Sequence, residues 1–387
     1  MKIPYGKQSI SQEDIDAVVD VLNSDWLTQG PMVPKFEKDF IDNFNCNYAV
    51  AVNSATSALH IACLALGVTK GDIVWTSANS FVASSNCALY CGADVDFIDI
   101  DLETYNICLT DLEDKLVEAK KKGNLPKVLI PVHLTGNPYD LEGIYKLSQE
   151  YNFKIIEDAS HAIGTHYKGE KIGSCRWSDI TVFSFHPVKI ITTGEGGVAL
   201  TNDKALSDKL ELFRSHGITR NKNLMTRKGI LPPWYYEQLE LGFNYRMTDI
   251  HAALGIKQLE KIESFLIRRN DIAKSYEKRL SSNSNVILPR VQKDCYSSFH
   301  LYVVLLNKKF DQQNHLEIFN ALRNKGIGVN LHYMPIYLQP FYKDKGFTEG
   351  KCPNAEQYSK RAISLPVFPS LTDLDLDNVF KALEEVL

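Results

Sequence analysis

The sequence predicts an α/β protein with a mostly parallel sheet, followed by a second, smaller α+β unit. Two observations predict the sheet: short apolar runs recur between residues 48 and 202, and segments with helical spacing separate them. The smaller unit is predicted because this alternation stops near residue 255 and a long amphipathic segment follows. We therefore expect a large domain over residues 1–255, including an N-terminal segment, and a small C-terminal domain over residues 256–387.

The expected elements can be justified in chain order. Ser11 and Asp14 have the spacing of a capping box, so the first helix is expected to begin there. The apolar runs that follow are the expected strands: YAVAV, DIVWTS, DVDFIDI, KVLIPVHL, FKIIEDA, DITVFSF and GVALTN. Residues 257–280 are typical of one long helix. The smaller unit is expected to contain strands at 299–306 and 328–333, a helix near 315–325 and a closing helix at 376–386.

Charge and composition argue against several functional classes. The 43 basic and 47 acidic residues give a net charge of -4, which offers no attraction for nucleic acid or an anionic membrane. The first residues lack the apolar run of an export signal, and the richest apolar stretch, at 49–67, is interrupted by polar residues. Eight cysteines form no Cys-x-x-Cys pair. We expect a cytoplasmic protein with no nucleic-acid, membrane or metal partner.

Two motifs at the ends of expected strands carry polar side chains. NSATSALH at 53–60 opens a helix, so its hydroxyls and free backbone N–H groups can hold a phosphate. Taken alone, this stretch is better explained as a helix cap. EDASHAIG at 157–164 places Asp158 at a strand end, where it can hold a cationic ring nitrogen or cap the next helix. Capping is again the stronger alternative for the motif alone.

Lys189 lies in SFHPVKIITTGEGG, among apolar neighbours. A free lysine has a pKa near 10.4. To make it a nucleophile at neutral pH, its pKa must be lowered by roughly three units, which corresponds to about 4 kcal/mol and which apolar surroundings can supply. The alternative is a lysine whose stem packs while its ammonium reaches water. Together, a phosphate site, an acidic residue and such a lysine form the set that pyridoxal 5'-phosphate (PLP) requires, although each motif alone is weak.

The chain resembles the sugar aminotransferases of the DegT/DnrJ/EryC1/StrS group, which have the aspartate aminotransferase (type I) fold. The resemblance covers nearly the whole chain, and it rests on these motifs together with SDWLTQGPMVPKFE, RSHGI and GFNYRMTDIHAALG. Within the group it is strongest to the aminotransferases of pseudaminic acid biosynthesis, through SFHPVKIITT and MTDIHAALG. The fold class implied is therefore a PLP-dependent transferase with a small C-terminal α+β domain.

The resemblance also implies roles for individual residues. Lys189 would bind the cofactor covalently and Asp158 would pair with its pyridine nitrogen. Phe81 would stack on the ring, although an aromatic residue between apolar strands is usually core. His161 stands where many members have a glutamine that contacts the 3'-oxygen. The phosphate would be held by Thr56, Ser57 and Ser184, and by Asn244 of a neighbouring subunit in a homodimer with shared active sites. The candidates for sugar-nucleotide contact are Tyr5, Thr28, Gln29 and His332.

The implied reaction moves an amino group from L-glutamate to C4 of a UDP-linked 4-keto-6-deoxy-N-acetylhexosamine. The product would be UDP-4-amino-4,6-dideoxy-N-acetyl-β-L-altrosamine, for pseudaminic acid biosynthesis. Members that remove a sugar hydroxyl carry histidine in place of the lysine, so Lys189 favours transamination. The alternatives are an aminotransferase for another nucleotide-linked keto sugar, a non-catalytic PLP-binding regulatory protein, and a nucleotide-binding α/β protein unrelated to this cofactor.

Overall fold

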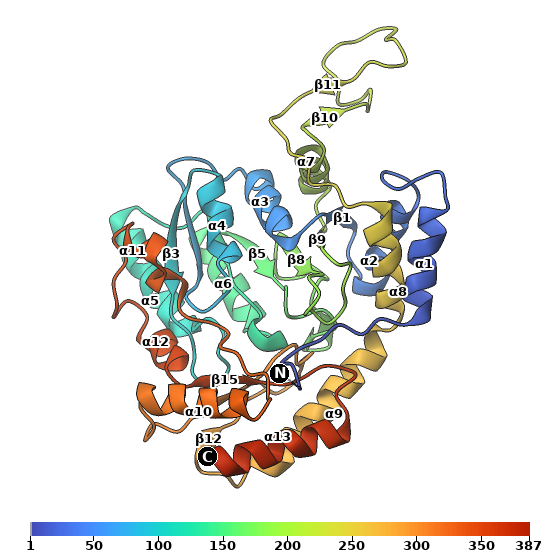
Figure 1. The fold of residues 1–387 in the computed structure, drawn as a ribbon. Coiled ribbons are helices and arrows are strands. Elements are labelled where there is room, and N and C mark those ends of the chain that lie inside the picture. Colours follow the sequence, from blue (N-terminus) through green and yellow to red (C-terminus); the bar gives the residue numbers. More distant parts are fainter. Residues whose placement is uncertain (1) are drawn as a thin grey trace.

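A computed structural model describes residues 2–387, and a central seven-stranded sheet organises its larger part (Figure 1). The seven apolar runs form its strands, as predicted. In spatial order they are β1 (Tyr48–Val52), β9 (Gly197–Thr201), β8 (Ile180–Ser184), β5 (Lys154–Asp158), β4 (Val128–Ile130), β2 (Ile73–Ser77) and β3 (Asp94–Ile98). Only β9 runs against the others, since it pairs antiparallel with both β1 and β8. The sheet is therefore mostly parallel.

Helices cover both faces of this sheet because both faces of its strands are apolar. In β1, Ala49 and Ala51 enter one core cluster, whereas Val50 and Val52 enter another. The first cluster is covered by α2 (Met32–Phe44), α5 (Leu109–Lys122), α6 (Leu141–Tyr151) and α8 (Asp249–Glu260). The second is covered by α3 (Ala55–Ala65), α4 (Ala83–Tyr90) and α7 (Lys204–Arg214). Each sheet face is thereby removed from water.

The first helix, α1 (Gln12–Leu22), begins as predicted. The backbone N–H of Ser11 donates to the Asp14 carboxylate at 2.7 Å, which completes the capping box. Asp14 is fully buried and also accepts from the Gln258 amide at 3.0 Å and pairs with Lys261. The cap therefore joins the N-terminal segment to the end of α8.

The single long helix predicted over 257–280 is wrong. The chain forms α8 and then α9 (Ile262–Leu280), separated at Lys261, where φ is -99° and ψ is 0°. Lys261 bonds to the Ser11 hydroxyl at 2.8 Å and pairs with Asp14, so contacts from the other end of the domain accompany the break. A one-residue interruption leaves the apolar spacing almost unchanged, which explains why the sequence pattern did not reveal it.

The smaller unit is built on a three-stranded sheet of β12 (Val286–Ile287), β14 (Tyr302–Leu306) and β15 (Ala362–Leu365). Its helices are α10 (Gln312–Asn324), α11 (Pro340–Lys343), α12 (Pro353–Ser359) and α13 (Asp373–Val386), so the predicted helices near 315–325 and 376–386 are confirmed. The expected strand at 328–333 does not form. Instead β15 takes the place beside β14, and the segment keeps one bridge, from Asn330 to Ser364.

Helix α9 contributes to two apolar cores. Phe265 and Leu266, near its start, pack in the core beneath the central sheet. Ile272, Tyr276 and Leu280, further along, pack in the core of the smaller unit. Figure 1 shows α9 leading from α8 into that unit, beside α13. The boundary expected at residues 255/256 stays a prediction.

The remaining elements are short. A three-stranded sheet contains β6 (His166–Tyr167), β7 (Glu170–Lys171) and β13 (Cys295–Tyr296), and single 3-10 turns occupy Leu134–Gly136 and Ile336–Leu338. The pair β10 (Ile218–Thr219) and β11 (Glu237–Gln238) belongs to an arm that projects from the body (Figure 1). Ile230 and Trp234 on this arm are exposed. Across residues 2–387, every helix is too short or too polar to cross a bilayer.

Candidate active site

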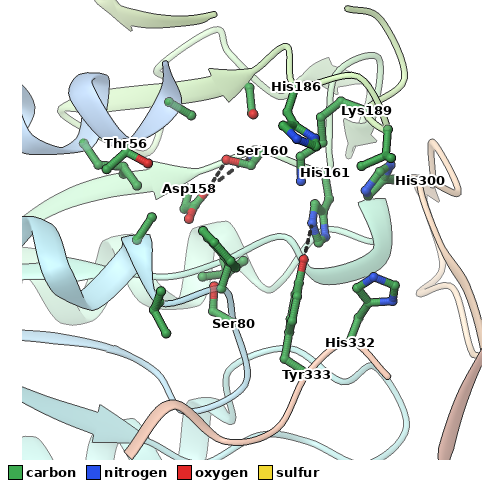
Figure 2. A pocket seen from close by; sticks show the side chains of 18 of the residues that line it. Thr56, Ser80, Asp158, Ser160, His161, His186, Lys189, His300, His332 and Tyr333 are labelled. Carbon is green, nitrogen blue, oxygen red and sulfur yellow. Dashed lines mark hydrogen bonds between the residues drawn. The ribbon is translucent and has the colours of Figure 1, made fainter. Parts of the chain in front are cut away.

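A cavity of about 730 Å³ opens where β5 and β8 end and α3 begins (Figure 2). Polar side chains gather at this edge because parallel strands end there together. Segments of the smaller unit, around residues 300 and 330–339, form part of its wall. Eight of the residues predicted to bind cofactor or substrate line it: Tyr5, Thr56, Phe81, Asp158, His161, Ser184, Lys189 and His332.

Asp158, the last residue of β5, is held in place by hydrogen bonds from two serines. One carboxylate oxygen accepts from the backbone N–H of Ser160 at 3.1 Å and from its hydroxyl at 2.6 Å. The other accepts from the Ser84 hydroxyl at 2.6 Å. A turn, not a helix, follows Asp158, so the helix-capping alternative is wrong. The buried carboxylate is instead available to a cation in the cavity.

Lys189 follows the turn after β8, and its side chain is half-buried in the cavity wall. The backbone N–H of Lys189 donates to the carbonyl of His186 at 2.8 Å, which closes the turn. Burial lowers the pKa of its amine to about 8, against the opposing effect of the Asp158 charge. Because the side chain of Lys189 lines the cavity, the alternative of a surface lysine with a fully hydrated ammonium is not supported. With a pKa of about 8, about a tenth of the amine is neutral at pH 7.

The N-terminus of α3 combines a helix cap with a free hydroxyl. Ser54 is the cap, and its hydroxyl accepts from the backbone N–H of Ser57 at 3.1 Å. Ser57 is buried, donates to the Asn53 side chain at 2.7 Å and does not line the cavity. Thr56 lines the cavity together with Ser184. The capping alternative thus holds for Ser54 and Ser57, whereas Thr56 remains a candidate phosphate ligand.

Gly197, the first residue of β9, allows this helix end to approach the sheet. A Cβ atom at Gly197 would lie 2.6 Å from the backbone nitrogen of Ala55 and 2.7 Å from the carbonyl carbon of Ser54. Both atoms belong to the backbone at the start of α3, so a side chain would displace the helix. The last glycine of the GEGG motif is therefore explained by the close packing of the start of α3 against β9.

Phe81 is not a core residue. Its side chain is 57% exposed and lines the cavity, with its ring centroid 6.2 Å from that of Tyr333. An aromatic ring exposed inside a cavity offers a flat apolar face to a planar ligand. The alternative of simple core packing is wrong for this residue.

Three buried histidines form the wall beside Lys189, and we call His161, His300 and His332 the histidine wall (Figure 2). The rings of His161 and His300 are 4.3 Å apart, and Nε2 of His161 lies 3.4 Å from the Tyr333 hydroxyl. Burial and the nearby Lys189 charge lower the pKa of all three, to about 3 for His332. The histidine wall is therefore neutral near pH 7.

Four predicted residues lie outside the cavity. Ser57 is buried in the cap described above. Thr28 and Gln29 lie exposed in the segment between α1 and α2, where Thr28 forms a bridge to Thr248. Asn244 is exposed and forms a bridge to Ser215 near the base of the arm. Within one copy of the chain, the structure does not bring these residues to Lys189.

The sequence interpretation missed several residues at the cavity. Ser84 and Ser160 bond to Asp158, and Tyr333 and His300 line the wall. Ser160 stood inside the EDASHAIG motif and could have been found as a neighbour of Asp158. Tyr333 and His300 come from irregular segments and Ser84 from the first turn of α4, where the sequence pattern does not show which side chains face a ligand.

Nearly the whole chain matches one known family. The DegT/DnrJ/EryC1/StrS aminotransferase family model aligns with residues 8–384. The chain belongs to this family. It is 39% identical over 390 residues to the UDP-4-amino-4,6-dideoxy-N-acetyl-β-L-altrosamine transaminase of Campylobacter jejuni, covering 99% of this chain and 98% of that protein.

Solved structures agree with this assignment. Helicobacter pylori PseC, an aminotransferase involved in the biosynthesis of pseudoaminic acid, superposes with a TM-score of 0.91 at 30% identity, covering 100% of this chain and 99% of PseC. Spr1654 of Streptococcus pneumoniae in its PLP form gives a TM-score of 0.88 at 29% identity, over 100% of both chains, and its PMP form also matches. The protein is therefore a PLP-dependent sugar aminotransferase with the predicted fold class, and not a non-catalytic regulator or an unrelated nucleotide-binding protein.

The residues present fit PLP. The cavity offers a buried carboxylate at Asp158, an amine of lowered pKa at Lys189, an exposed ring at Phe81, and the hydroxyls of Thr56 and Ser184. When bound, PLP supplies an electron sink that stabilises negative charge on the carbon next to the transferred nitrogen. The substrates of such an enzyme are an amino donor and a nucleotide-linked keto sugar.

Proposed function

We propose that this aminotransferase moves the amino group of L-glutamate to C4 of a UDP-linked 4-keto-6-deoxy-N-acetylhexosamine. The product is UDP-4-amino-4,6-dideoxy-N-acetyl-β-L-altrosamine, a precursor of pseudaminic acid. The relative from Campylobacter jejuni and the similarity to PseC support this substrate class. The observation that carries the proposal is the amine of Lys189, whose pKa of about 8 and place in one cavity with Asp158 suit it to proton transfer.

In this proposal the chain's own residues divide the work. Lys189 holds the cofactor covalently between turnovers, then takes the proton from the α-carbon of the amino donor and returns one to C4 of the sugar. Asp158 keeps the ring nitrogen protonated, and its hydrogen bonds from Ser84 and Ser160 hold the carboxylate in place. Thr56 and Ser184 bind the phosphate, with Ser57 supporting the helix end. Phe81 stacks on the ring.

The sugar nucleotide is assigned to the other side of the cavity. Tyr5 and His332 line it with their ring centroids 5.1 Å apart, so they can contact the sugar. His161 is proposed to donate to the 3'-oxygen of the cofactor in place of the usual glutamine. Its neutral imidazole can supply one N–H for that bond.

A homodimer with shared active sites completes the proposal. Asn244, Thr28 and Gln29 lie outside the cavity of their own chain. Their exposure suits residues that act in a neighbouring subunit, with Asn244 reaching the phosphate and the other two reaching the sugar nucleotide. Sedimentation of the holoenzyme tests the dimer. Mixing the inactive variants Lys189→Ala and Asn244→Ala tests the sharing, because heterodimers should regain one intact site and measurable activity.

The substrate is tested with a panel of keto-sugar nucleotides and L-glutamate. The UDP-linked 4-keto-6-deoxy-N-acetylhexosamine should give the highest kcat/KM, and NMR of the product should place the new amine on C4. An amine on C3, or a higher kcat/KM with another nucleotide or sugar, would replace this substrate by another one of the same class. Borohydride reduction tests the site, since it should fix the cofactor on Lys189 alone.

A further inference from the structure

Arg269, on α9, is a buried cation without an acidic partner. It is 1% exposed, and its guanidinium donates to three backbone carbonyls: those of Phe299 at 3.2 Å, His300 at 3.3 Å and Val367 at 3.0 Å. Burial lowers the pKa of the guanidinium to about 10. Burying an unpaired charge is costly for a protein, so three neutral acceptors are a weak reason to keep an arginine for stability alone.

Two of those carbonyls belong to the segment that enters the cavity wall. Phe299 has a φ of +42°, a region that side chains with a Cβ rarely adopt and that persists only where neighbours fix it. On either side the segment bonds to the larger part of the molecule: the Ser298 hydroxyl donates to the carbonyl of His161 at 2.9 Å, and Leu301 N–H donates to Thr135 at 3.2 Å. Arg269 is therefore one of the contacts that fix this backbone.

His300 is the side chain that this backbone presents to the cavity. Its ring lies 4.3 Å from that of His161, and its Nδ1 is buried without a hydrogen-bond partner. The ionisable groups that face it are His161, Lys189, Arg269 and His332. Burial and these four groups lower the pKa of His300, so the charge of Arg269 helps to keep the imidazole neutral.

We propose that Arg269 is a positioning residue for the transamination, which acts by holding His300 against His161 in the histidine wall. The planar guanidinium suits this role because one group can reach carbonyls on two chain segments at once. The inference rests on the proposed function only in taking this cavity as the active site. Arg269 does not line the cavity and has no other part in the proposed reaction.

Arg361 offers a matched control. It is also a buried arginine, 6% exposed, and it donates to a backbone carbonyl, that of Leu306, at 2.7 Å. It lies outside the cavity lining. Arg269→Lys and Arg361→Lys should therefore lower the free energy of unfolding similarly. Only the first should alter the active site.

The first measurement uses the cofactor-free protein labelled with ¹⁵N in its histidines. In Arg269→Lys the NMR signals of the His300 and His161 rings should shift, and in Arg269→Met the protonation midpoint of His300 should also rise, because a facing positive charge is lost. Arg361→Lys should leave both signals as in the wild type. If the Arg269 variants shift these histidine signals no more than Arg361→Lys does, the proposal is overturned. Arg269→Lys keeps the test valid if Arg269→Met does not fold.

The second measurement is a double-mutant cycle on the holoenzyme. Arg269→Lys should lower kcat/KM on the order of tenfold, and the same change in a His300→Gln background should lower it less than about twofold, because the residue through which it acts is gone. Losses that simply multiply in the double variant overturn the proposal. Failure of the proposed function has a different signature, since borohydride would then label a side chain other than Lys189 while the NMR result stood.

Discussion

The two sides of the cavity are built differently. On one side, Asp158, Ser184 and Thr56 lie at the ends of regular elements, β5, β8 and the start of α3. On the other side, His300, His332 and Tyr333 come from irregular segments of the smaller unit. The first side holds charged or hydroxyl groups with assigned chemical roles. The second holds neutral rings, which fix the polarity around Lys189.

One side of the cavity therefore supplies the reacting groups, and the other side forms their surroundings. The strand-end side carries the groups that a PLP enzyme needs, and they are positioned by the sheet itself. The histidine wall is part of the surroundings of the amine of Lys189, and burial in these surroundings lowers the pKa of that amine. Changes to the reacting groups on the first side should therefore cause the largest losses of rate. Changes on the second side should cause smaller losses of rate and should alter the pH dependence of the stability of the fold.

The largest effect is expected for Lys189→Ala. Turnover should fall on the order of 10⁴-fold or more, because both the covalent attachment and the proton transfer are lost. Steady-state assays with L-glutamate and the keto sugar measure this. Exposed Lys204 provides the control, since Lys204→Ala should retain wild-type rates. Full activity in Lys189→Ala would remove the central role of the strand-end side.

Asp158→Asn should follow, with a loss on the order of 10²–10³-fold in kcat/KM, because the negative charge opposite the ring nitrogen is removed. Ser160→Ala keeps the charge and removes one hydroxyl donor to it, so a loss of about tenfold is expected. The kcat/KM values of the two variants, measured with cofactor in excess, show whether the charge of Asp158 or the orientation of its carboxylate matters more. Equal losses would mean that the hydrogen bonds, and not the charge, matter most.

Lys189 should also lower the stability of the cofactor-free fold. Its folded pKa of about 8 lies below the value of 10.5 for the free side chain, so the folded state resists protonation. The cost is complete below pH 8, about 3 kcal/mol, and it disappears as the pH rises from 8 to 10.5. Lys189→Met should accordingly raise the free energy of unfolding at pH 7 in urea titrations. A gain that is unchanged at pH 10.5 would assign the effect to packing.

The smallest effect concerns the histidine wall. Burial lowers the pKa of His332 to about 3, so below about pH 6.5 the unfolded chain takes up a proton that the folded chain does not, and the fold loses stability as the pH falls from 6.5 toward 3. His332→Gln should reduce the slope of unfolding free energy against pH by about 1.4 kcal/mol per unit in this window. Met334→Leu, at an exposed cavity position without a titratable side chain, should leave the slope unchanged. Equal slopes in the two variants would contradict a buried neutral His332.

The same contrast explains how far the sequence could predict the structure. The seven strands of the large sheet were predicted because their apolar runs alternate with helices, and Asp158 and Lys189 stood in motifs next to those runs. His300 and Tyr333 fall inside strands expected at 299–306 and 328–333, but both residues lie in irregular backbone, which contacts far away in the chain hold in place. The break at Lys261 was also missed, because it leaves the apolar spacing almost unchanged and is accompanied by contacts to Asp14, far away in the chain.

Helix α9 has a consequence for how the molecule loses its structure. Phe265 and Tyr276 lie on one continuous helix but in different cores. Unfolding of either core therefore disrupts the helix on which the other core also packs. Heating should therefore give one cooperative calorimetric transition for the whole chain. A fragment that stops before α9 should aggregate, since the apolar surface that this helix covers would be exposed to solvent.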